Sequence, residues 1–316
     1  MNINDLVTHY VAFRRTLGEQ FKTNEFMLRA FCRAVGSRMQ VNRIRLKDVN
    51  AFLASPRAIT RTWHCKYFAL KGFFKFAVSR GHLDKAPLPP AVPKLPPTVV
   101  PYIYSRAELR RLLDAIPTYR PFPSHMEAPT LRAILLIVYG AGLRRGEVLN
   151  LSIPDVDLPN ALLTIRNTKF FKSRLVPIST DLAKVLSDYA RWRTAAHPLS
   201  SATGTFFLNR RGEPVHQCTL DNAFKRLREY AGVRRSDGGR YQPRLHDLRH
   251  TFAVHRLTAW YRQGADVQRL IHHLSVYLGH AHLVDTQVYL TMTPELLQQA
   301  STRFERWYNQ QEDNHA

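Results

Sequence analysis

A proline-rich segment constrains the fold of this chain more than any other feature. Residues 86–101 read APLPPAVPKLPPTVVP, which contains seven prolines and no glycine. Because proline lacks an amide donor and fixes the backbone φ angle, such a segment favours a semi-rigid extended conformation. A chain of 316 residues is long enough for about two domains. We therefore expect one domain at residues 1–85, a linker at 86–101 and a second domain at 102–316.

The first domain is predicted to consist of helices. Apolar pairs indicate helices around residues 31–35 and 49–53. Another helix is predicted from about residue 60 to residue 80, where Gly81 provides a C-terminal stop. The first helix is expected to bury one face, on which apolar residues recur at intervals of three and four: Leu6, Tyr10, Phe13 and Leu17.

The chain is strongly basic. It carries 46 lysine and arginine residues against 24 aspartate and glutamate residues, which gives a net charge of +22. A surplus of one sign on this scale points to a polyanionic partner. Nucleic acid is the first candidate for that partner, and an anionic membrane surface is the second.

Basic side chains follow the helix predicted at residues 60–80, beside its apolar face. Between Pro56 and Leu83 the sequence contains no acidic residue. A basic helix face can simply be solvated, but the lack of acidic residues favours contact with a DNA backbone. The residues predicted to make that contact are Arg61, Lys66, Lys71 and Lys75.

Cysteine content and the length of the apolar runs indicate the cellular compartment of the protein. The three cysteines are far apart and odd in number, which argues against a disulfide framework and fits a reducing cytoplasm. The N-terminal residues lack the apolar core of a signal peptide. The longest apolar run, at residues 133–143, is shorter than the ~20 residues that a membrane-spanning helix needs. We expect a soluble cytoplasmic protein without membrane contact.

The second domain is predicted to be mainly helical with a small β-sheet. Ser105 and Glu108 form a capping-box pattern ahead of an apolar helix. The sequences ALLTIRN and SRLVPIS, joined by TKFFK, indicate two strands, and TFFL at residues 205–208 indicates another. Further helices are predicted near residues 129–139, 182–193, 219–230 and 245–264.

Five short pieces of the second domain carry residues suited to phosphate chemistry. His246 and Arg249 are three positions apart, so on a helix they share a face. Taken singly, each candidate has an ordinary structural explanation, such as an ion pair between Arg144 and Glu147. In chain order, the pieces contribute Arg144, Lys169, His246, Arg249, His280 and Tyr289.

A histidine-rich stretch raises the question of a metal site. His272, His273, His280 and His282 are close together in the sequence. No set of carboxylates or thiolates at metal-ligand spacing accompanies them. The sequence therefore predicts neither a metal site nor any other cofactor.

Together, the candidate residue types suit phosphoryl transfer. Arginine guanidinium groups bind two phosphate oxygens at once and stay protonated, so two of them can stabilise transition-state charge without a metal ion. A tyrosine phenol has a pKa of about 10 and is a weak nucleophile at neutral pH, but nearby cations favour the phenolate. A lysine beside the leaving oxygen can supply its proton. This combination favours Tyr289 as a nucleophile over Tyr289 as a packing residue.

The order of these pieces resembles that of the tyrosine recombinases, also called the phage integrase family. The matching segments are AGLRRGE, TKFFKSRLVPI, LHDLRHTFAV, LGH and DTQVYL, and they extend through the whole second domain. The first domain is similar, more weakly, to the helical core-binding domain of that family. The resemblance implies an α+β catalytic domain at residues 102–316 and a DNA-binding domain at residues 1–85.

The resemblance also implies a role for each candidate side chain. Arg144 and Arg249 would hold the scissile phosphate, and His280 would hydrogen-bond to it. Tyr289 would attack the phosphorus and form a 3′-phosphotyrosyl link. His246 would assist proton transfer.

The leaving 5′ oxygen would take its proton from Lys169. The family commonly has Gly-Lys-Gly at this lysine, whereas residues 168–172 here read TKFFK. The spacing to Arg174 favours Lys169. The missing glycines keep Lys172 as an alternative general acid, and it is also a candidate DNA contact.

These implications predict a site-specific DNA recombinase that cleaves and rejoins strands without ATP or metal. Its partners would be double-stranded recombination sites and further copies of the chain, as a dimer on one site and a tetramer in synapsis. Bound to DNA, it would lie with the bacterial nucleoid. A type IB topoisomerase and a non-catalytic DNA-binding protein are the alternatives, and the topoisomerase family generally has lysine where His246 stands.

The C-terminal segment is predicted to be an assembly helix. Residues 293–295 suit a helix N-terminus, with a threonine cap, a proline and a glutamate. The helix can cover its apolar face on its own domain, but the family resemblance favours docking on a neighbouring protomer. That face consists of Leu297, Ala300, Phe304 and Trp307.

Overall fold

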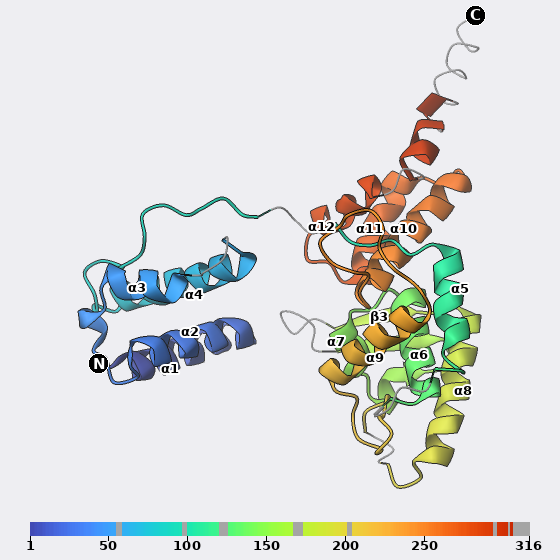
Figure 1. Cartoon of the computed structure of the whole chain (residues 1–316), viewed down its shortest axis with the longest axis horizontal. Coiled ribbons are helices and arrows are strands. Elements are labelled where there is room, and N and C mark those ends of the chain that lie inside the picture. Colours follow the sequence, from blue (N-terminus) through green and yellow to red (C-terminus); the bar gives the residue numbers. More distant parts are fainter. Residues whose placement is uncertain are drawn as a thin grey trace, which may run out of the picture. The chain divides into compact units, whose positions relative to one another are not determined.

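The computed structural model describes residues 1–54, 59–96, 100–119, 126–166, 173–200, 204–292, 296–302 and 304–305. The chain divides into two compact units, and the division falls within the proline-rich segment. Helices dominate the described residues, and a three-stranded sheet lies in the second unit (Figure 1). The predicted fold class, mainly α with a small β-sheet, is confirmed.

The described residues of the first unit form a helical bundle. Helix α2 packs against both α1 and α4, and their apolar side chains share one core. All of the helices predicted in this region are present, and they are α1 (Ile3–Thr16), α2 (Lys22–Val35), α3 (Leu46–Leu53) and α4 (Arg61–Ser79).

The predicted buried face of α1 is only partly correct. Leu6 and Tyr10 are buried, but Phe13 is 39% exposed and Leu17 is 60% exposed. The helix ends before Leu17, and the Phe13 ring stacks on the partly buried Phe76 instead of entering the core. The buried stripe lies closer to the N-terminus, at Ile3, Leu6, Val7, Tyr10 and Val11.

The second unit contains a short antiparallel sheet among helices. Its helices are α5 (Arg106–Ala115), α6 (Ala128–Gly140), α7 (Arg145–Leu149), α8 (Thr180–Ala196), α9 (Gln217–Tyr230), α10 (Asp247–Arg262), α11 (Val267–Leu278) and α12 (Val284–Gln287). The strands, in spatial order, are β1 (Val156–Asp157), β2 (Leu162–Ile165) and β3 (Arg174–Pro177). Leu163 pairs with Val176 between the second and third strands, and both side chains are buried.

Helix α6 accounts for the longest apolar run of the sequence, because it packs against both α8 and α10. After this helix the chain turns at Gly142, which has a positive φ of 60°. A Cβ atom at Gly142 would lie 2.5 Å from the Phe252 side chain. Since only glycine tolerates both the backbone angle and the close approach, this residue fixes the path of the chain towards Arg144.

Some elements differ from the sequence predictions. Residues 205–208 were expected to form a strand, but Thr205 and Leu208 each make only an isolated bridge. Phe206 and Phe207 are buried in the core, so this apolar run reflects packing on all sides rather than strand pairing. Helix α11 was not predicted, because histidines interrupt its apolar pattern, and strand β1 is too short to leave a signal.

Only part of the predicted C-terminal helix lies within the described residues. Residues 296–302 are helical, with Leu296 buried and Leu297 49% exposed. The predicted cap at residues 293–295 and Trp307 lie outside the described residues. Across the described ranges, no helix is both long and apolar enough to cross a lipid bilayer.

Candidate active site

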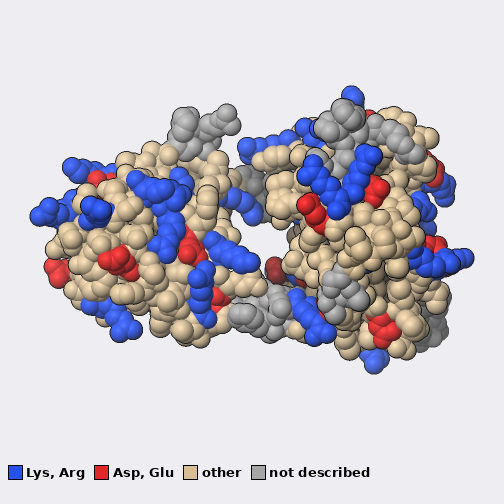
Figure 2. All heavy atoms as spheres, turned by 90° about the horizontal axis from the view of Figure 1, so that it is seen from below, with Lys and Arg blue, Asp and Glu red and all other residues tan. Residues whose placement is uncertain are grey.

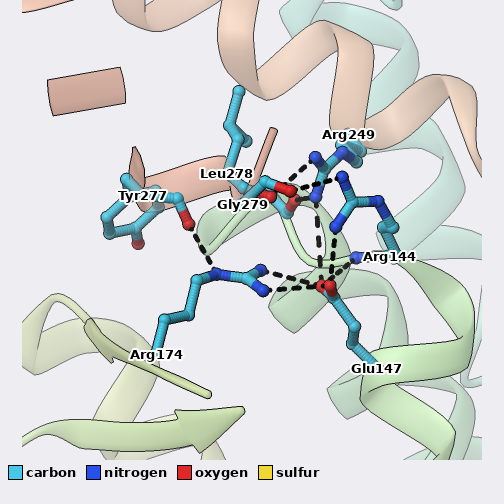
Figure 3. Close-up of polar contacts among 8 residues, drawn as sticks. Arg144, Glu147, Arg174, Arg249, Tyr277, Leu278 and Gly279 are labelled. Atoms are coloured by element: carbon cyan, nitrogen blue, oxygen red, sulfur yellow. Dashed lines mark hydrogen bonds and ion pairs between the residues drawn. The ribbon is translucent and has the colours of Figure 1, made fainter. Parts of the chain in front are cut away.

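Arg144 stands at the start of α7, directly after the turn at Gly142. Its backbone amide donates to Glu147 Oε2 at 2.9 Å, and its Nη1 donates to Glu147 Oε1 at 2.8 Å. Its Nη2 donates to the Gly279 carbonyl at 2.7 Å. The predicted pairing with Glu147 is therefore present, but it holds the guanidinium over a loop that is distant in the sequence (Figure 3).

Arg249 reaches the same place from α10. Its side chain is almost fully buried, and Nη1 and Nη2 donate to the carbonyls of Gly142 and Leu278 at 2.6 and 2.8 Å. Burial, together with the charge of Arg144, lowers the pKa of Arg249 to about 10. The group therefore remains cationic at neutral pH.

The carboxylate of Glu147, whose side chain is 9% exposed, lies between the two arginines, and sequence reasoning did not identify its role. Arg174 of β3 donates through Nη1 and Nη2 to both oxygens of Glu147 at 3.0 and 2.9 Å (Figure 3). Arg249 Nη1 lies 4.0 Å from Glu147 Oε2. Burial opposes ionisation, but the hydrogen bond and charge of Arg174, aided by Arg144, lower the pKa of Glu147 to about 2.

Arg174 also ties β3 to the end of α11. Its Nε donates to the Tyr277 carbonyl at 3.0 Å. Gly279 has a positive φ of 69°, and a Cβ atom there would lie 2.6 Å from Arg174 Nη1. This close packing sets the position of His280, which is the next residue. In the sequence, Arg174 served only as a reference point for choosing between the two neighbouring lysines.

Tyr289 lies in a short 3₁₀ helix, Val288–Thr291, and is 2% exposed. Its Oη is 3.0 Å from His250 Nδ1. Desolvation raises the pKa of Tyr289, although the charge and hydrogen bond of Arg249 act in the opposite direction. The phenol is therefore protonated at neutral pH in the free protein.

The His250 and His280 rings lie against this phenol, and His246 lies behind His250. The His280 ring stacks on Tyr289 with the ring centroids 6.1 Å apart, and its Nδ1 is 2.6 Å from Thr286 Oγ1. The His246 ring meets the His250 ring edge to face at 4.8 Å. Desolvation and the charge of Arg249 lower the pKa values of His246 and His280 to about 4, so both rings are neutral at pH 7.

The structure thus brings together five of the six predicted catalytic residues. The sixth, Lys169, and its alternative Lys172 lie outside the described residues. A cavity of about 670 Å³ opens beside Arg144 and His246. Its charged lining residues are Arg144, Arg145, Asp221, Lys225, Arg228, Glu229 and Arg244.

The predicted DNA contacts on α4 differ in their surroundings. Lys71 and Lys75 are exposed and one helical turn apart, and Arg61 is exposed at the start of the helix. Lys66 instead donates to the Phe52 carbonyl at 2.9 Å and lies 4.4 Å from the centre of the Phe52 ring. On the face shown in Figure 2, basic side chains cover more of the surface than acidic ones.

Side chains of the types that can bind a metal ion are scattered across the described ranges. Among these residues, no three or more histidine, cysteine, aspartate or glutamate side chains are grouped as a metal ion would require. His272 and His273 are both exposed on α11. The charges of Arg249, Arg144 and Asp285 act on Tyr289, and the two guanidinium groups favour its phenolate.

Comparison with known proteins identifies the family of this chain. The model of the phage integrase family matches residues 104–295. An integrase/recombinase of Sinorhizobium fredii, y4rE, is 35% identical over 303 residues, which cover 95% of each chain. Tyrosine recombinase XerA of Pyrococcus furiosus is 32% identical over 260 residues, which cover 81% of this chain and 80% of the relative.

Solved structures share the fold. The integrase of transposon Tn1549 matches with a TM-score of 0.68 and 18% identity, over 97% of this chain and 99% of that one. Lambda integrase matches with a TM-score of 0.64 and 17% identity, over 92% of this chain and 77% of that one. The likeness in fold, the matching family model and the two relatives all agree, and this chain belongs to the phage integrase family of tyrosine recombinases.

Proposed function

We propose that this enzyme is a site-specific DNA recombinase that cleaves and rejoins strands through a covalent 3′-phosphotyrosyl intermediate on Tyr289, without ATP or metal. One observation carries the proposal. Arg144 and Arg249, from separate elements, both lie beside the carboxylate of Glu147, and the charge of Arg249 lowers the pKa of the buried Tyr289 against the effect of desolvation. A cationic pair beside a phenol is what phosphoryl transfer to tyrosine needs.

The two arginines are suited to bind the scissile phosphate. A guanidinium has five N–H donors, and the side chain of Arg144 uses two groups on Glu147 and Gly279. Its further donors can serve the non-bridging oxygens. Because the anchoring groups fix the guanidinium before DNA arrives, little reorganisation is needed in the transition state.

The proposed chemical steps assign one role to each of these side chains, as the family resemblance implies. Tyr289 Oη attacks phosphorus, the bond to the 5′ oxygen breaks, and Lys169 or Lys172 protonates that oxygen. His280 hydrogen-bonds to the phosphate, and His246 assists proton transfer. The phosphotyrosyl bond retains the energy of the broken bond, so a 5′ hydroxyl from a second strand can reverse the reaction without ATP.

DNA sites and further copies of the chain are the proposed partners. Among the solved neighbours, lambda integrase is described as a dimer bound to a core site and as a tetramer bound to a Holliday junction. XerH is described bound to its difH substrate before and after cleavage. We propose the same stoichiometry here, with residues 293–307 docking on a neighbouring protomer and residues 1–85 acting as the core-binding domain.

Exposed lysines on α4 give this proposal a binding test. Replacing Lys71 and Lys75 with glutamine is expected to weaken binding to all DNA sequences alike. The slope of log K against log salt is negative, and each lost phosphate contact should make it less steep by roughly 0.9. The measurement is a salt titration of binding. The matched control replaces Lys22 and Arg33, which are exposed on α2, and an equal loss there would mean that α4 has no special role.

Strand cleavage and exchange test the proposed function as a whole. Purified protein should cleave its site in excess chelator and should exchange strands between two labelled sites. Cleavage that disappears in chelator and returns with magnesium would contradict the metal-free mechanism. Nicking and closing without exchange would identify a topoisomerase-like activity, and binding without cleavage would identify a non-catalytic DNA-binding protein.

A further inference from the structure

His250 makes a contact that the proposed mechanism does not yet use. It follows Arg249 on α10, and its Nδ1 lies 3.0 Å from Tyr289 Oη. The two ring centroids are 5.6 Å apart. The imidazole also meets the His246 ring edge to face. His250 therefore lies against the atom that would attack DNA.

We propose that His250 is a catalytic residue, the general base that takes the phenolic proton of Tyr289. The inference rests on the proposed function of Tyr289 as the nucleophile. As the bond from Oη to phosphorus forms, the proton passes from Oη to His250 Nδ1. The bond to the 5′ oxygen breaks, and that oxygen takes a separate proton from the lysine acid. The reverse transfer returns the first proton to Oη when the strand is rejoined.

The other two imidazoles have different contacts. His280 Nδ1 faces the Thr286 hydroxyl at 2.6 Å, and the His280 ring lies nearly parallel to the phenol ring rather than pointing a nitrogen at its oxygen. His246 packs on His250 itself. Among these three imidazoles, the ring whose nitrogen meets Tyr289 Oη is therefore that of His250, and geometry comes first in assigning a general base.

The electrostatic setting keeps His250 able to accept a proton. Desolvation, followed by the charges of neighbouring groups, lowers the pKa of His250 to about 3, so the imidazole is neutral. A DNA phosphate beside Arg144 and Arg249 adds negative charge, which offsets the effect of the neighbouring positive charges and raises the pKa of His250. Bound substrate therefore makes the proton transfer less unfavourable than it is in the free protein. The groups that act on His250 are His246, Arg249, Arg244, His280 and Tyr289.

A substitution series separates proton transfer from positioning. His250→Asn keeps a side-chain oxygen that can accept the phenol hydrogen bond but cannot take the proton. We expect covalent-adduct formation at pH 7 to slow by about 10²- to 10³-fold, within the range for a lost general base. The matched control is His255→Asn, because His255 Nδ1 lies 3.0 Å from Tyr139 Oη in another histidine–tyrosine pair, on which the charges of Arg106 and Arg256 act instead of those of Arg144 and Arg249. This control should cleave at the wild-type rate.

The pH profile gives a second, independent result. Without a base, Tyr289 must lose its proton to solvent, so the rate of His250→Asn should rise about tenfold per pH unit between pH 7 and 9. The wild-type rate should change little over that range. A His250→Asn variant with the wild-type rate and profile would overturn the proposal and leave His250 as a positioning residue.

A modified substrate distinguishes this inference from the proposed function. A 5′-bridging phosphorothiolate has a leaving group that needs no proton. It should therefore rescue substitution of the lysine acid by alanine, at Lys169 or Lys172, but should not rescue His250→Asn. Rescue of His250→Asn would assign His250 to the leaving group and overturn the proposal. If the wild type forms no adduct at Tyr289 with either substrate, the proposed function itself has failed.

A measurement on the unmodified protein needs no variant. To accept the phenol proton, His250 must carry its own proton on Nε2 and leave Nδ1 bare. Nitrogen-15 NMR of the histidine-labelled full chain should show that tautomer at pH 7. A proton on Nδ1 would rule out the proposed transfer, even if His250→Asn failed to fold.

Discussion

Replacing Tyr289 with phenylalanine is expected to abolish covalent capture of DNA while the fold and DNA affinity survive. The change removes a single hydroxyl, and the lost hydrogen bond to His250 should lower the free energy of unfolding by about 1 kcal/mol. The ring itself can keep its packing in the apolar cluster with Phe252 and Leu278. Without Oη no bond to phosphorus can form, so adduct formation on a nicked suicide substrate should fall below detection.

The matched control for this variant is Tyr139→Phe. Tyr139 Oη lies 3.0 Å from His255 Nδ1, so this change removes the same kind of hydrogen bond. Tyr139→Phe should form adduct at the wild-type rate, and both variants should bind DNA with wild-type affinity. If Tyr289→Phe still formed adduct, another residue would have to be the nucleophile.

Replacing Glu147 with glutamine is expected to destabilise the fold and impair cleavage together. Arg144 and Arg174 both donate hydrogen bonds to this one carboxylate, and Arg249 Nη1 lies 4.0 Å from its Oε2. Loss of its charge leaves three guanidinium groups close together in a largely buried site, which is strongly unfavourable. DNA should partly restore the melting temperature of this variant, because a phosphate supplies the missing negative charge.

The pH dependence identifies the charge as the cause. The pKa of Glu147 is about 2 in the fold, against an ordinary value of 4.5 for this side chain. Its carboxylate therefore stabilises the fold above pH 4.5, and this stability is lost as the pH falls through about 2. The shift corresponds to about 3 kcal/mol. In urea unfolding, the deficit of Glu147→Gln should be large at pH 7 and should shrink as the pH approaches 2.

Glu108 provides the control for that experiment. It occupies the same capping-box position on α5, where it accepts hydrogen bonds from Ser105. Because glutamine can also fill this capping-box position, Glu108→Gln should lower the free energy of unfolding far less than Glu147→Gln does, and it should leave cleavage unchanged. A deficit for Glu147→Gln that is equal at pH 7 and near pH 2 would contradict the electrostatic explanation.

The sequence predicts five side chains that the structure brings together, but it does not predict the groups that hold them in place. Arg144, Arg249, His280 and Tyr289 were identified from the order of motifs and from the chemistry of arginine and tyrosine. Their anchors include the carbonyls of Gly142, Leu278 and Gly279. Any residue type carries a backbone carbonyl, so these partners leave no sequence signal.

Glu147 and His250 were missed for a different reason. Both stand inside quoted motifs, AGLRRGE and LHDLRHTFAV, but each has an ordinary local explanation as a helix residue. Their roles depend on contacts with Arg174 and Tyr289, which are 27 and 39 positions away. The helices of the first unit were predictable because helical periodicity is local, whereas these contacts depend on tertiary packing.

Mapping the DNA-linked residue tests the central claim most directly. Wild-type protein trapped on a nicked suicide substrate is digested with nuclease and trypsin, and the nucleotide-bearing peptide is sequenced by mass spectrometry. Trypsin releases residues 270–303, which include both Tyr277 and Tyr289. We predict a 3′-phosphonucleotide on Tyr289. A nucleotide on Tyr277 or on any other residue, or no adduct from folded protein that binds its site, would contradict the account.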